Sequence, residues 1–86
     1  MGLSGEVVSE FVPLVHKALG PERLWVAGYC NQVFGYVPSA RIVREGGYEA
    51  RGLIGPEIGW FSADAQDVLV AAVEKLARKA GRTPMP

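Results

Sequence analysis

Residues 24–30, LWVAGYC, form an uninterrupted apolar run soon after a Gly-Pro break. Its short length and its Trp, Val and Tyr residues predict a β-strand that is buried on both faces. Because buried backbone N–H and C=O groups need partners, one such strand cannot stand alone. Residues 33–37 and 50–58 could pair with it as strands or be ordered loops, and a second chain is the remaining source of partners.

The N-terminal segment carries the signals of a helix over residues 4–19. Ser4 can cap its start, and Gly20 with the following proline ends it. Pro13 conflicts with a continuous helix because it removes a backbone donor, so we expect a kink or a restart there. The apolar residues of one helical face are Val8, Phe11, Val12, Val15 and Leu19.

Two further helices are predicted downstream. Residues 39–45 form a short one, with Ser39 as N-cap and Gly46 as the left-handed C-terminal residue. Residues 62–80 form the clearest one, with Ser62 as N-cap, acidic residues in the first turn and basic residues in the last. Its apolar stripe consists of Ala65, Val68, Leu69, Ala72, Val73, Leu76 and Ala80.

This order of elements indicates an α/β fold, with α+β as the alternative, built on a small incomplete sheet. Eighty-six residues form a single small domain at most. Nine basic residues balance nine acidic ones, so we expect no nucleic-acid partner. No apolar run approaches the roughly 20 residues that cross a bilayer, so we expect no transmembrane segment. Cys30 is the only cysteine, which excludes an internal disulfide.

Taken one at a time, the polar residues predict little chemistry. The only histidine, His16, suits a helix surface better than a ligand position. Glu6 and Glu49 suit solvated carboxylates, and the three tyrosines suit packing. Asn31 follows the predicted strand, where α/β folds place their sites, but asparagine is also a common turn residue.

The stretch GYCNQVFGYVPSARIVREGGYE, residues 28–49, holds an ordered set of motifs. A predicted strand ends in Gly-Tyr-Cys-Asn, a Gly-Tyr-Val-Pro-Ser turn follows, and Gly-Gly-Tyr-Glu closes the set after a short helix. Upstream lies SGEVVSEF, residues 4–11. From about residue 3 to residue 81, the chain resembles the C-terminal part of the catalytic domain of neutral/alkaline ceramidase-like proteins, in particular their bacterial homologues.

The resemblance implies a zinc-dependent amidase that cleaves the N-acyl bond of ceramide. In that family two histidines, a glutamate and a tyrosine hold the metal, and motif matching assigns Glu6 and Tyr48 as the last two. A carboxylate and a phenol can join imidazoles around zinc. By the same resemblance, the residues of the pocket and the surroundings of the metal are Asn31, Tyr36, Gly46 and Gly47.

The chain departs from the family because neither histidine ligand is present and His16 matches neither motif. We therefore expect a C-terminal piece of a larger catalytic domain, inactive alone, with zinc as the family's cofactor and an incomplete metal site here. The alternative is a non-catalytic α/β module that self-associates through apolar residues of 50–61. Both hypotheses predict a homo-oligomer or an association with a further region. The family is often secreted or periplasmic, and no export signal is present.

Overall fold

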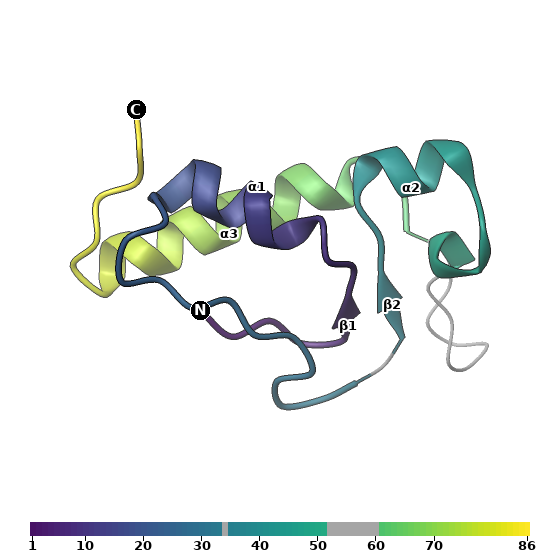
Figure 1. Cartoon of the computed structure of the whole chain (residues 1–86), viewed down its shortest axis with the longest axis horizontal. Coiled ribbons are helices and arrows are strands. Elements are labelled where there is room, and N and C mark those ends of the chain that lie inside the picture. Colours follow the sequence, from purple (N-terminus) through teal and green to yellow (C-terminus); the bar gives the residue numbers. More distant parts are fainter. Residues whose placement is uncertain (34, 52–60) are drawn as a thin grey trace.

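The chain is a mixed arrangement of helices and one small sheet (Figure 1). The computed structural model describes residues 1–33, 35–51 and 61–86. The predicted mixed α/β class is confirmed. In chain order the elements are β1 (Glu6–Val7), α1 (Phe11–Leu19), β2 (Tyr36–Val37), α2 (Ala40–Glu45), the 3₁₀ turn η1 (Tyr48–Arg51) and α3 (Ala65–Lys79).

The sheet consists of β1 and β2, which run parallel to each other. Glu6 pairs with Tyr36, and Val7 pairs with Val37. The Val8 N–H extends the ladder by donating to the carbonyl of Val37 at 3.1 Å. The sequence allows either a strand or a loop at residues 33–37, and of these Tyr36 and Val37 form a strand. The other such segment, residues 50–58, lies almost wholly outside the described residues.

The predicted buried strand over residues 24–30 is wrong. Within this segment only Ala27 makes a bridge, a parallel one with Gly2. Trp25 is 89% exposed and Tyr29 is 61% exposed. Tyr29 also has a φ of +59°, which interrupts an extended backbone. The segment is therefore an irregular edge along the N-terminal residues, with Leu24 and Val26 half-buried against the core and Trp25 and Tyr29 exposed on the other side.

The predicted helix over residues 4–19 begins later than expected. Its helical part, α1, starts at Phe11, and Ser4 is not its cap because residue Glu10 occupies that position. Glu6 and its neighbour instead form β1. Pro13 consequently falls in the first turn of α1, where the N–H that proline lacks has no partner within the helix. Because α1 starts at Phe11, Pro13 is compatible with a continuous helix, and no kink is needed inside it.

The two helices predicted downstream are present as α2 and α3. Ser39 is the N-cap of α2, since its Oγ accepts from the Ile42 N–H at 3.4 Å. Gly46 ends α2 with a φ of +87°. The last helix, α3, begins three residues later than predicted, with Asp64 rather than Ser62 at its N-cap, because the Ser62 carbonyl holds the first turn.

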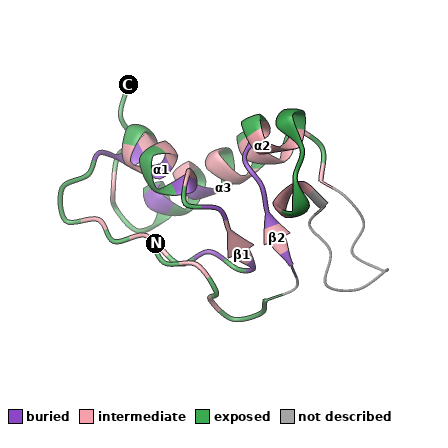
Figure 2. Ribbon diagram, turned by 45° about the vertical axis from the view of Figure 1, so that its right-hand side comes forward, coloured by how far each residue is buried: buried purple, intermediate pink, exposed green. Residues whose placement is uncertain are grey.

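The hydrophobic core lies mainly between α1 and α3 and against the N-terminal segment (Figure 2). Phe11 and Val15 are fully buried on α1, and α3 contributes Val73 and Ala77. Only part of the predicted stripe of α3 is therefore in the core. The buried apolar residues are Leu3, Val8, Phe11, Val15, Leu19, Val37, Val73 and Ala77.

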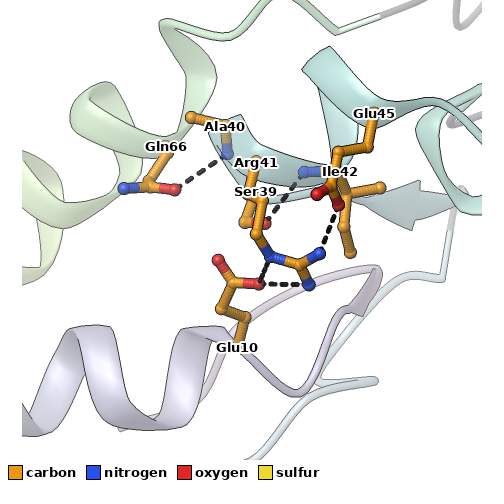
Figure 3. Close-up of polar contacts among 7 residues, drawn as sticks. All are labelled: Glu10, Ser39, Ala40, Arg41, Ile42, Glu45 and Gln66. Atoms are coloured by element: carbon orange, nitrogen blue, oxygen red, sulfur yellow. Dashed lines mark hydrogen bonds and ion pairs between the residues drawn. The ribbon is translucent and has the colours of Figure 1, made fainter.

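A polar network joins the three helices at the end near α2 (Figure 3). Arg41 donates through Nε to Glu10 Oε1 at 2.8 Å and pairs with Glu45 one turn further along α2. The Ala40 N–H donates to Gln66 Oε1 on α3 at 2.8 Å. Since α2 has no fully buried residue of its own, these contacts and the packing of the half-buried Ile42 on the core hold it in place.

The C-terminal tail closes the opposite end of the core. Arg82 donates to the carbonyls of Leu19, Gly20 and Glu22, at distances of 3.1, 3.0 and 2.8 Å. These include carbonyls that the end of α1 leaves without helical partners. No helix in the described ranges is long and apolar enough to cross a membrane.

Phe11→Ala should destabilise the protein by about 3–5 kcal/mol, because it removes a fully buried ring from the centre of the core. Urea unfolding followed by circular dichroism measures the change. Val12→Ala is the matched control on the same helix, and its loss should stay near or below about 1 kcal/mol because Val12 is half exposed. Equal losses in the two variants would contradict this description of the core.

Glu10 should make stability depend on pH. The hydrogen bond from Arg41 lowers the pKa of Glu10 in the folded protein. This contribution is present above the unfolded carboxyl pKa and is lost as the pH falls through the folded value. Glu10→Gln should lower the thermal midpoint by a few degrees at neutral pH, and the difference should disappear as the pH falls through the folded pKa of Glu10, where its carboxyl becomes neutral. Glu22→Gln, an exposed carboxylate elsewhere, should show no such difference.

Candidate functional site

Glu6 lies beside two tyrosines on the sheet. It is in register with Tyr36 on the neighbouring strand, so the two side chains project from the same face of the pair. The Tyr29 hydroxyl donates to Glu6 Oε1 at 2.9 Å. Residues from three segments of the chain therefore meet at one carboxylate.

A third tyrosine joins this group from η1. The rings of Tyr36 and Tyr48 are 5.4 Å apart between centroids and cross at 81°, an edge-to-face contact. Gly46 and Gly47 connect α2 to η1 with φ values of +87° and +104°, which favour glycine. The turn made by these two glycines brings Tyr48 against Tyr36. We call Glu6, Tyr29, Tyr36 and Tyr48 the tyrosine cluster.

The carboxylate sets the electrostatics of the cluster. The hydrogen bond to Glu6 raises the pKa of Tyr29, because it stabilises the neutral phenol. Desolvation raises the pKa of Tyr36, and the negative charge of Glu6 and the neighbouring Tyr48 raise it further. All of these effects keep the two phenols protonated at neutral pH. The cluster thus places the Glu6 side chain among three phenols, of which Tyr29 and Tyr48 are largely exposed to solvent.

The sequence assignments are placed as follows. Glu6, Tyr36 and Tyr48 are brought together, and Gly46 with Gly47 shapes the approach of Tyr48. Asn31 is exposed, and its side chain makes no hydrogen bond to a described residue. Its φ of +62° suits a turn asparagine.

Sequence reasoning missed Tyr29 as a site residue. The resemblance assigns site roles to Tyr36 and Tyr48, whereas the apolar run places Tyr29 in the interior of a buried strand. The structure instead exposes Tyr29 and directs its hydroxyl to Glu6. The one available signal was its place within the Gly-Tyr-Cys-Asn motif, two residues before Asn31.

The cluster does not by itself meet the needs of zinc. Zinc sites use three or four protein donors, with imidazole and thiolate prominent among them. Within residues 1–33, 35–51 and 61–86, no group of three His, Cys, Asp or Glu side chains could hold a metal ion. His16 lies in the last turn of α1. The carboxylate and phenols of the cluster are therefore a partial donor set.

Comparisons with protein-family models, with curated proteins and with solved structures found no match to this chain. The resemblance to ceramidase-like proteins thus stays a prediction from residues 4–11 and 28–49. The arrangement of Glu6 and the tyrosines is the feature against which that prediction can be tested.

Glu6→Gln should lower the pH at which Tyr29 and Tyr36 ionise. The carboxylate opposes formation of a phenolate, so removing its charge should bring both pKa values back toward the ordinary value for tyrosine. A pH titration followed by phenolate absorbance reports this change, since the chain has only three tyrosines. An unchanged titration would mean that Glu6 does not lie against the phenols in solution. Glu22→Gln is the control and should not shift the curve.

Proposed function

We propose that this chain supplies the carboxylate and phenol donors of a zinc site in a ceramidase-like amidohydrolase. The carrying observation is that Glu6, Tyr36 and Tyr48, which are distant in sequence, converge across the β1–β2 pair. The same residues lie in the motifs on which the resemblance rests. The order of the motifs and the spatial arrangement of the residues therefore both support the proposal.

The register of the sheet favours Tyr36 as the phenol that shares an ion with Glu6. Tyr36 is paired directly with Glu6, whereas Tyr48 reaches the cluster through the edge of the Tyr36 ring. Motif matching had assigned the donor role to Tyr48. In the proposed site the phenol donor is therefore Tyr36 rather than Tyr48. Tyr48 packs against Tyr36 and orients its ring.

Tyr29 has a positioning role in this proposal. Its hydroxyl binds Oε1 of Glu6, which fixes the carboxylate and leaves Oε2 as the oxygen available to a ligand. Carboxylates that bind metals are commonly held in this way by a hydrogen-bonding neighbour. Two imidazoles from another region would complete the metal site. A zinc ion bound there would act as a Lewis acid that activates water and polarises an amide carbonyl. The chain alone should therefore not hydrolyse N-acyl amides.

Zinc titration in the presence of free imidazole tests the proposal, because imidazole can stand in for the absent histidines. Calorimetry should detect zinc binding that weakens about tenfold or more in Glu6→Gln and in Tyr36→Phe. Tyr48→Phe should have a smaller effect, since the ring contact with Tyr36 is kept.

Two controls separate this site from adventitious binding. His16→Gln removes the only imidazole side chain, and Glu22→Gln removes a carboxylate outside the cluster. Both should bind zinc as the unmodified chain does. Zinc binding that is lost in His16→Gln but kept in Glu6→Gln would contradict the proposal, as would no zinc binding at any imidazole concentration.

A second candidate function is a non-catalytic module that self-associates. The interface first expected for it, over residues 50–61, lies almost wholly outside the described residues. A different surface favours this candidate, because α3 exposes large apolar side chains at Val68 and Leu76.

A further inference from the structure

One face of α3 is apolar and uncovered by the described part of the chain. Val68 is 69% exposed and Leu76 is 55% exposed. Ala72 lies between them at the same four-residue spacing, so the three form a row along the helix. Val73 and Ala77, which face the core, lie on the adjacent side of the helix, since Leu76 is three residues beyond Val73. The α1 helix packs on α3 (Figure 1), and Val68 and Leu76 remain exposed.

A groove deepens this face beside the N-terminal half of α3. It is a cavity of about 540 Å³, and its walls are mainly apolar. The residues that line it include Leu3, Val37 and Phe61 on one side and Val68, Leu69 and Ala72 on the other. An apolar row that continues into an apolar groove is typical of a docking surface rather than of scattered surface residues.

The charges that flank this row have opposite signs at its two ends. Asp64 lies beside the row at the start of α3, and Lys75 and Lys79 lie beside it toward the end. Across the described ranges, none of these three side chains forms an ion pair. A helix with this pattern is complementary to a copy of itself that runs in the opposite direction.

We propose that the row on α3 binds the α3 of a second copy of this chain in an antiparallel, two-fold symmetric pair. Ala72 lies at the symmetry axis, where its small side chain lets the helices approach closely. Val68 then packs on the partner's Leu76, and the reverse contact follows by symmetry. Asp64 lies by the partner's Lys79, and the same pair recurs at the other end of the contact by symmetry.

This surface is separate from the tyrosine cluster. Successive residues of a strand point to opposite faces, so Val37 enters the groove while Tyr36 enters the cluster. The dimer therefore does not depend on the proposed zinc site. A result that overturns one proposal leaves the other standing.

The first experiment measures the mass of the 86-residue chain in solution over a range of concentrations. At about 100 µM, sedimentation or light scattering should give twice the 9.2 kDa chain mass. Leu76→Lys should give the single-chain mass, because it places a charge in the apolar contact. Val12→Lys, a change at an exposed valine on α1, is the matched control and should remain dimeric. Circular dichroism checks that each variant keeps its helices.

A charge reversal tests the orientation. Asp64→Lys and Lys79→Asp should each weaken the dimer by about fivefold or more, because each places like charges side by side. The double variant restores both pairs in an antiparallel dimer and should recover the original affinity. High salt should weaken the unmodified dimer.

Three outcomes would overturn the proposal. The first is a single-chain mass up to roughly 500 µM, well above the dissociation constant of a specific contact of this kind. The second is a dimer that survives Leu76→Lys, which would place the interface elsewhere. The third is a double charge variant that stays as weak as the single ones, which would exclude the antiparallel pairing.

Discussion

The parallel contact between β1 and β2 is the interaction on which the candidate site depends. Two strands of two residues each are too short to be stable alone, so their pairing must be held from outside. The core does this, because Val8 and Val37 are buried beside the strand pair together with Phe11. The register that places Glu6 opposite Tyr36 is thus maintained by apolar packing on the other face of the same strands.

The elements that the sequence predicts correctly are those whose signals are local. The α2 helix follows from a serine cap and a terminal glycine, and α3 follows from its charge distribution and periodicity. The β1 strand could not be found in this way, because it is defined by a partner strand far along the chain. The apolar run at residues 24–30 misled for the same reason, since burial requires something to cover it and little does.

The sequence likewise predicts only part of the candidate site. Motif order brought Glu6 and Tyr48 into one hypothesis, and the fold places both in one cluster. The contact of Tyr29 with Glu6 and the direct pairing of Tyr36 could not be predicted, because both depend on the register of a sheet that the sequence does not reveal. A motif names residue types in order, whereas a donor set depends on which of them share a face.

The strand pair also separates two surfaces within the described part of the chain. One face carries the Glu6 side chain among phenols, and the other leads into the apolar groove beside α3. A thin domain of this size buries a limited share of its apolar surface, so an uncovered helix face costs it free energy that a second copy can recover. Antiparallel pairing through α3 would satisfy that face and leave the tyrosine cluster of each copy accessible. The proposed association and the proposed ligand binding would therefore be compatible in one molecule, because each would use a different side of the same two strands.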